Sequence, residues 1–215
     1  MTRRSRCWLG IMTAVILIGA TLAVVPAAPA PVLRAAGWAL VRDDPIERAD
    51  VIVIAADADG EGVLEAADLV QKGVATRVAL FSDPPDAIDQ EFLRRGVPYE
   101  DRAAVSTRQL TALGITAIEH IARASGTEAE ARVLPEWCER EGIRSLIFVT
   151  TRDHSRRLRR VVQRSMTGHT TRIMVRPSRY SKFDPDRWWQ SRDGIRTQIV
   201  ELQKLVLDVM SHPGF

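Results

Sequence analysis

Short β-branched and apolar runs recur along this chain, and they constrain its fold more than any other feature. Residues 50–56 form a continuous β-branched run between Asp50 and Asp57, which is typical of a strand buried on both faces in a parallel sheet. Similar runs occupy residues 76–82, 145–151 and 171–176, and a weaker one occupies residues 117–122. The sequence therefore predicts about five strands.

Helical patterns separate these runs. They cover residues 63–72, 87–95, 107–113, 128–141 and 155–164. A glycine, the residue that most often ends a helix, follows each of them: Gly73, Gly96, Gly114, Gly142 and Gly168. Alternating strands and helices build right-handed βαβ units. We therefore expect an α/β fold, a three-layer Rossmann-like open parallel sheet of about five strands with helices on both faces.

The last segment, residues 194–210, has the pattern of one more helix. Its apolar side chains fall on about one face: Ile195, Ile199, Leu202, Val206, Val209 and Met210. This spacing predicts an amphipathic helix that packs its apolar face on the domain and does not span a membrane.

The N-terminus has the pattern of a membrane segment. Arg3, Arg4 and Arg6 precede an uncharged stretch that runs from residue 7 to residue 33, and its most apolar part, residues 8–25, has about the minimum length of a transmembrane helix. The basic cluster favours a single-pass, N-in orientation, with the rest of the chain outside the cytoplasm. The prolines of residues 26–31 predict a short extended stalk.

A cleaved signal peptide is the alternative to an anchor. Ala28, Pro29 and Ala30 offer a small-x-small cleavage site, but Pro31 would follow the cut, and proline is a poor residue there. We favour an uncleaved N-terminal transmembrane helix. The organisation expected is an anchor and stalk over residues 1–31 and one α/β domain over residues 32–215.

Composition excludes several classes of protein. The formal net charge is only +3, so the basic pI is not by itself a sign of nucleic-acid binding. The two cysteines, Cys7 and Cys138, form no CxxC pair, so neither a disulfide framework nor a zinc site is indicated, and we expect no metal site. The sequence lacks GxSxG, HExxH and P-loop motifs, and it indicates no particular cofactor.

The loop after the fourth strand carries the stronger chemical pattern. Ligands of open α/β sheets bind beyond the carboxyl ends of the strands. Thr150 and Thr151 end a strand there, and a helix N-terminus, which favours anions, follows. His154 and Arg157 are three residues apart and share a helical face, so they can act as an acid/base and an anion clamp. A structural alternative is that a threonine caps the helix while His154 and the arginines lie in solvent.

Two further segments are candidate parts of the same site. Asp57 and Asp59 follow the first strand in an acidic loop that lacks GxGxxG and can bind hydroxyl groups, although such residues also make ordinary turns. Thr127 and Glu130 form a capping-box pattern at a helix start. Such a start can also bind an anion, so both residues are candidate ligand-binding groups.

Several of these segments together resemble the ElyC/SanA/YdcF family of bacterial envelope proteins. The resemblance runs from about residue 46 to residue 208, and its most specific parts are the threonine, histidine and arginine segment and the Trp188-Trp189 segment. It is carried by residues 49–54, 66–67, 73–75, 127–131, 149–151, 154, 157, 177–180, 183–189, 201 and 204–205.

This resemblance implies a Rossmann-like domain, often behind a membrane anchor, that is linked to peptidoglycan and envelope biogenesis and has no settled reaction. The family pattern places functional groups on Thr127, Glu130, Thr150, His154 and Arg157. Members usually carry a glycine-rich turn after the first strand and an arginine at the start of the next helix. Here the turn is acidic, and Gly62 falls near the place of that arginine.

Three functional hypotheses follow. In the preferred one, a protein of the cytoplasmic membrane binds a phosphorylated or nucleotide-like ligand, such as a lipid-linked envelope precursor, in an extracytoplasmic crevice, with His154 as acid/base. In the second, a non-enzymatic accessory protein contacts envelope-synthesis proteins. The third is a Rossmann-type binder of a nucleotide cofactor, which the missing glycine fingerprint disfavours.

Overall fold

A single five-stranded parallel sheet forms the centre of the molecule. The computed structural model describes residues 29–122, 124 and 126–215. The strand order is β3-β2-β1-β4-β5, and every neighbouring pair is parallel. The strands are β1 (Val51–Ile54), β2 (Val78–Phe81), β3 (Ile118–Ile121), β4 (Ser145–Thr150) and β5 (Arg172–Pro177). All five predicted strands are therefore present, and the predicted α/β class is confirmed.

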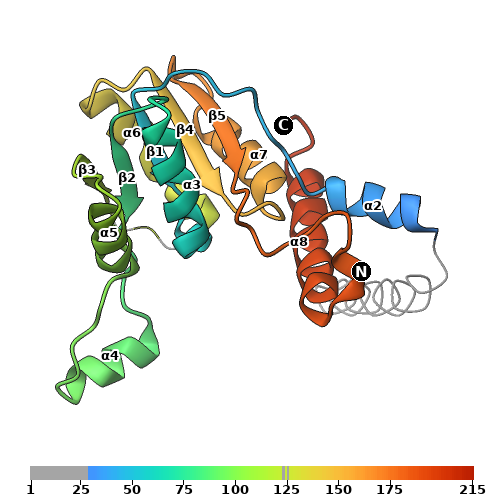
Figure 1. Cartoon of the computed structure of the whole chain (residues 1–215), viewed down its shortest axis with the longest axis horizontal. Helices are drawn as coiled ribbons and strands as arrows, with labels where there is room; N and C mark the ends of the chain where they lie inside the picture. The colour runs from blue at the N-terminus through green and yellow to red at the C-terminus, as the bar shows by residue number, and fades with distance from the viewer. Residues whose placement is uncertain (1–28, 123, 125) are drawn as a thin grey trace, which may run out of the picture.

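Helices connect the strands and form two outer layers. They are α3 (Asp59–Gln71), α4 (Ala87–Arg94), α5 (Arg102–Ala112), α6 (Thr127–Arg140) and α7 (Ser155–Ser165). The pair α3 and α5 covers one face of the sheet, and the pair α6 and α7 covers the other, as right-handed crossovers require (Figure 1). The five glycines predicted to end helices all have positive φ. Helix α4 buries none of its residues and lies away from the sheet (Figure 1).

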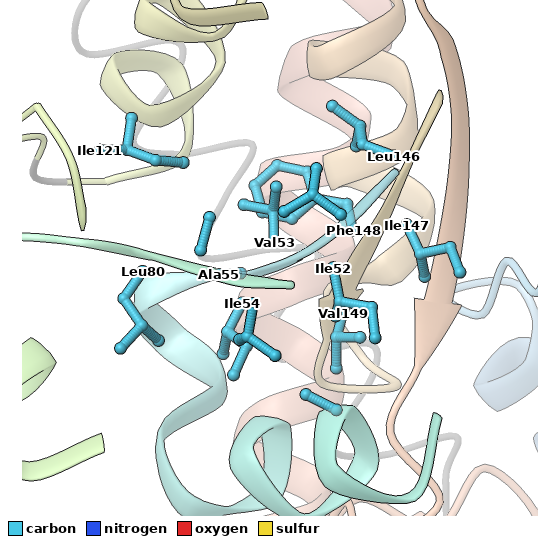
Figure 2. Close-up of a cluster of buried hydrophobic side chains, with 14 of the residues drawn as sticks. Ile52, Val53, Ile54, Ala55, Leu80, Ile121, Leu146, Ile147, Phe148 and Val149 are labelled. Carbon is cyan, nitrogen blue, oxygen red and sulfur yellow. The ribbon is translucent and has the colours of Figure 1, made fainter. Parts of the chain in front are cut away.

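The core lies where β1 and β4 meet (Figure 2). Alternate side chains of β1 point to opposite faces, and Phe148 of β4 packs near Phe81 with ring centroids 5.9 Å apart. Gly62 of α3 lies so close to β1 that a Cβ atom would come within 2.7 Å of Ile54 Cγ2. A larger residue at position 62 would therefore push α3 away from β1.

Two more helices lie outside the three layers, α2 (Ala30–Trp38) and α8 (Arg192–Ser211). Helix α2 corrects the expected stalk, because residues 30 and 31 are helical: a proline fits the first turn, where no amide donor is needed. A second apolar cluster joins α2 to the C-terminal part, and Trp188 Nε1 donates to the Leu33 carbonyl at 2.7 Å. The predicted anchor lies in residues 1–28, outside the described residues, and no helix within the described ranges is long and apolar enough to cross a membrane.

The orientation predicted for α8 is wrong for its second half, although Ile195 of the predicted face does pack against the second apolar cluster. Its buried residues are Gln198, Glu201, Leu205 and Asp208, whereas Leu202, Val206, Val209 and Met210 of the predicted core face are exposed. The cause lies in α7, whose arginines do not all point into solvent. Asp208 pairs with Arg160 at 2.6 Å and with Arg164 at 3.0 Å. These ion pairs turn the polar stripe of α8 inward.

Candidate functional site

The candidate site lies at the carboxyl ends of β1 and β4. These two strands are neighbours, and the strand order reverses between them, since β2 and β3 lie on one side and β5 on the other. Open α/β sheets bind ligands at this switch point. Helices α6 and α7 both begin near it and pack against each other. The edge predicted from the sequence is therefore the one where polar side chains gather.

His154 lies at the centre of this cluster of polar side chains. It precedes α7 and is only 3% exposed. Its Nε2 atom lies 3.0 Å from Thr127 Oγ1 at the start of α6 and 3.7 Å from a carboxylate oxygen of Asp57. Its Nδ1 atom lies 2.9 Å from Arg157 Nη2 and 3.4 Å from Glu201 Oε2. The structural alternative of a solvent-exposed histidine is therefore wrong.

These distances assign the proton of the neutral imidazole. A guanidinium can only donate, so the shorter Nδ1 contact makes Nδ1 an acceptor from Arg157, and Nε2–H donates to Thr127. Protonation of the ring would place a hydrogen on Nδ1, where Glu201 can accept it and Arg157 can no longer donate. Arg157 thus stabilises the neutral ring, and Glu201 stabilises the protonated ring. This arrangement suits a side chain that exchanges a proton.

Arg157 and Glu201 hold each other inside the cluster. Arg157 Nε lies 3.3 Å from Glu201 Oε2, its Nη1 donates to Thr127 at 3.3 Å, and its side chain is only 16% exposed. Burial would raise the pKa of Glu201, but its contacts with His154 and Lys204 and the charge of Arg157 lower it to about 2. The pKa shift indicates a carboxylate that stays charged across the ordinary pH range.

Glu201 is the site residue that sequence reasoning missed. It belongs to the stretch that carries the family resemblance, but its helix was expected to turn its apolar face inward. A carboxylate three residues before Lys204 also has the pattern of an exposed helical ion pair, and the two do pair at 2.6 Å. The signal that could have found it is the arginine-rich α7, which needs acidic partners.

Thr150, Asp57 and Glu130 form the other side of the site. Thr150 is fully buried at the end of β4, and its hydroxyl donates to Asp57 at 3.4 Å. Glu130 of α6 is 3% exposed. Burial, together with the negative charge of Asp57, raises the pKa of Glu130 to about 7, although His154 and an Ala56 backbone amide act in the opposite direction. The raised pKa makes Glu130 a group of the site that titrates near neutral pH.

Two predicted site residues lie outside this network. Asp59 is exposed and pairs with Arg102 of α5 at 3.7 Å. Thr151, the residue that follows β4, is only partly buried. The site therefore brings together Asp57, Thr127, Glu130, Thr150, His154 and Arg157. Among residues 29–122, 124 and 126–215, no group of three histidine, cysteine or acidic side chains has the arrangement of a metal site.

Comparisons with known proteins leave the family unassigned. No family model matches the chain, and no curated protein matches it. Among solved structures, the chain is similar to a universal stress protein crystallised in complex with cAMP. The similarity covers 61% of this chain and 99% of that one, with a TM-score of 0.36 and 14% sequence identity. A likeness at this level carries no conclusion about function.

Proposed function

We propose that this chain is a membrane-anchored protein of the bacterial cell envelope, related to peptidoglycan and envelope biogenesis, whose site binds a phosphorylated or nucleotide-like ligand. The envelope part of the proposal is supported by the apolar N-terminal segment and by the family resemblance of the sequence. The ligand part is carried by one observation: Thr127, His154 and Arg157 converge at the start of α6, at the switch point of the sheet.

The start of α6 is the better place for the anionic group of such a ligand. Thr127 there receives donor groups from both His154 and Arg157, and helix N-termini favour negative charge. The start of α7 is partly used, because the Arg156 amide donates to the Leu40 carbonyl at 3.1 Å. Thr150 is turned toward Asp57, so it does not provide the anion contact expected from the sequence.

The carboxyl groups fit the rest of a phosphorylated ligand. Asp57 is 44% exposed and can accept hydrogen bonds from ribose or sugar hydroxyls. Glu130 carries a proton part of the time near neutral pH, because its pKa is raised to about 7. His154 Nε2–H points toward Thr127, and therefore toward the place where an anion would sit. In this proposal, the ring acts as an acid in its doubly protonated form, with Nδ1–H held by Glu201. It donates the Nε2 proton to a leaving oxygen and recovers a proton from the attacking water during turnover.

A non-enzymatic accessory role is the second candidate. Arg157 is already neutralised by Glu201, and Asp57 adds another negative charge to the site. A phosphate would have to compete with these carboxylates for Arg157. An accessory protein that retained the fold would need no free arginine, and it would act by contact with envelope-synthesis proteins.

Ligand-induced stabilisation distinguishes these functions. The full chain in detergent is screened by thermal shift against nucleotides, polyprenyl phosphates and peptidoglycan precursors. A ligand at a hundredfold excess over its Kd should stabilise the protein by about 2.7 kcal/mol. Arg157→Ala should weaken that binding by about 1.5–3 kcal/mol, the contribution of a charged hydrogen bond. His154→Gln should abolish turnover of a bound substrate.

Arg132→Ala is the matched control, because Arg132 is exposed on α6, the helix that begins with Thr127. It should leave binding unchanged. The ligand-binding proposal fails if no ligand of these classes shifts the melting temperature. It also fails if the Arg157→Ala and Arg132→Ala variants bind the ligand with the same affinity. The accessory role then becomes the better one.

A further inference from the structure

Helix α8 exposes a continuous apolar surface along its second half. We call this surface the outer face of α8 and define it as Leu202, Val206, Leu207, Val209 and Met210. Leu207 is 63% exposed and Met210 is 74% exposed, and each of the other three is at least 38% exposed. The polar residues of this half of the helix that remain exposed are few, chiefly Gln203 and Lys204. A scattered exposed leucine is ordinary, but a contiguous group of this kind marks a contact surface.

This surface cannot turn inward without breaking the site. The opposite side of α8 carries Glu201 and Asp208, which pair with Arg157 and Arg160 of α7. Rotating the helix to bury its apolar residues would leave those arginines without their partners. The outer face therefore stays outside while the domain remains folded, and the described core leaves it uncovered.

The N-terminal part of the chain indicates what covers it. Helix α2 lies beside α8 (Figure 1), and Gln198 Nε2 donates to the Ala36 carbonyl at 2.9 Å. Only four residues, 26–29, lie between Val25, the last residue of the apolar stretch, and Ala30 at the start of α2, so Ala30 is the fifth residue after Val25. Five residues span at most about 18 Å. If residues 8–25 cross the membrane, α2 and its neighbour α8 must lie close to the lipid surface.

We propose that the outer face of α8 rests on the lipid surface of the membrane. This inference depends on the membrane anchor of the proposed function and adds which face of the domain meets the lipid. Two features of α2 agree with it: Val32 is 58% exposed, and Trp38, a residue favoured at membrane interfaces, is 47% exposed. Exposed Arg34 and Arg196 on the same two helices can contact anionic headgroups.

The arrangement has a consequence for the site. An α-helix with its side chains is about 10–12 Å across. Glu201, on the inner side of α8, contacts His154 at 3.4 Å. With its outer face on lipid, α8 holds the His154 cluster about one helix diameter from the membrane surface.

The test uses the full chain in vesicles of phosphatidylcholine and phosphatidylglycerol. In a background that carries Cys7→Ala and keeps the buried Cys138, Leu207→Cys and Met210→Cys are each labelled with an environment-sensitive fluorophore. Phe92→Cys on α4 is the matched control, because Phe92 is 51% exposed and apolar but lies on the helix that stands away from the sheet. Lipid-borne nitroxides should quench positions 207 and 210 several-fold more than position 92.

Two other outcomes overturn the inference. If aqueous iodide quenches positions 207 and 210 as strongly as position 92, the outer face lies in water. If neither quencher reaches these positions, residues 1–28 or a second copy of the chain cover the surface. A carbonate wash distinguishes failure of this inference from failure of the anchor. Protein that stays with the vesicles but shows no lipid quenching contradicts only the inference. Protein that is washed off contradicts the membrane anchor as well.

Discussion

Helices α7 and α8 are both amphipathic, but α7 buries its apolar face and α8 buries its polar face. Helix α7 buries its apolar residues Leu158, Val161 and Val162 against the sheet, as its periodicity predicts. Helix α8 buries Glu201 and Asp208 and exposes its apolar stripe. The difference follows from what each helix meets. Helix α7 meets an apolar sheet. Helix α8 meets the polar side of α7 along its second half, and only Leu205 and Ile195 pack in the second apolar cluster.

The comparison teaches that a second-layer helix is oriented by the helix beneath it. Arg157, Arg160 and Arg164 project from α7 away from the sheet, and each is at most 17% exposed because α8 covers it. Each covered arginine left without a partner costs about 3–5 kcal/mol, which exceeds the roughly 1.5–3 kcal/mol gained by burying one more aliphatic side chain. Charge pairing therefore decides the orientation of α8, and the hydrophobic stripe takes the remaining side.

The largest effect on stability expected from this comparison comes from a substitution at Glu201. Glu201→Ala should lower the free energy of unfolding by about 3–5 kcal/mol, because it leaves Arg157 largely buried without its carboxylate. The neighbouring change Leu202→Ala, on the exposed side of the same helix, should alter stability by no more than about 0.5 kcal/mol. Urea unfolding of the full chain in detergent, followed by circular dichroism, measures both. Equal costs for the two substitutions would contradict the inverted orientation of α8.

A smaller, pH-dependent effect is expected on the other side of the site, at Glu130. The folded pKa of Glu130 is raised from 4.5 to about 7, so the folded state binds more protons than the unfolded state between these pH values. Its contribution to stability therefore falls as pH rises from 4.5 to 7, by up to about 3 kcal/mol, and stays low above that range. Glu130→Gln removes this loss.

The measurement is the difference in unfolding free energy between Glu130→Gln and the unaltered protein at pH 4.5 and at pH 8. The variant should gain relative stability with rising pH. Glu136→Gln, at an exposed position of the same helix, is the control and should show no such trend. A flat difference for Glu130→Gln would mean that folding does not raise the pKa of Glu130, and its assignment as a near-neutral titrating group would be wrong.

The sheet could be predicted from the sequence because its determinants are local. The run of residues 50–56 has no charged residue between its two bounding aspartates, and only a strand buried on both faces suits it. Gly73 and Gly142 end helices where their positive φ values are needed. The start of α2 is not evident from the sequence, because prolines usually break helices, although a proline in the first turn is compatible with one.

The site could be predicted only in part, for a different reason. His154 and Arg157 share a helical face that local spacing defines, and the structure does bring them together with Thr127. Glu201 is 44 residues further along the chain than Arg157, and its inward direction depends on α7. Asp59 was assigned from its loop, but it faces Arg102 instead. Contacts between layers depend on tertiary packing. The periodicity within one helix does not predict them.

The smallest effect should come from Gln198, the neutral member of the buried polar stripe of α8. Its Nε2 donates to the Ala36 carbonyl at 2.9 Å, while its buried Oε1 has no hydrogen-bond partner among the residues that the structure describes. Gln198→Met, of similar volume, removes one neutral hydrogen bond but also removes an unpaired buried oxygen, and each is worth about 1 kcal/mol. The two terms oppose each other, so the free energy of unfolding should change by less than about 1 kcal/mol. Gln198→Ala, which opens a cavity, should cost more and serves as the comparison in the same urea titration. A loss above about 2 kcal/mol for Gln198→Met would show that neutral hydrogen bonds also hold α8 in its inverted orientation, and that the ion pairs with α7 are not sufficient.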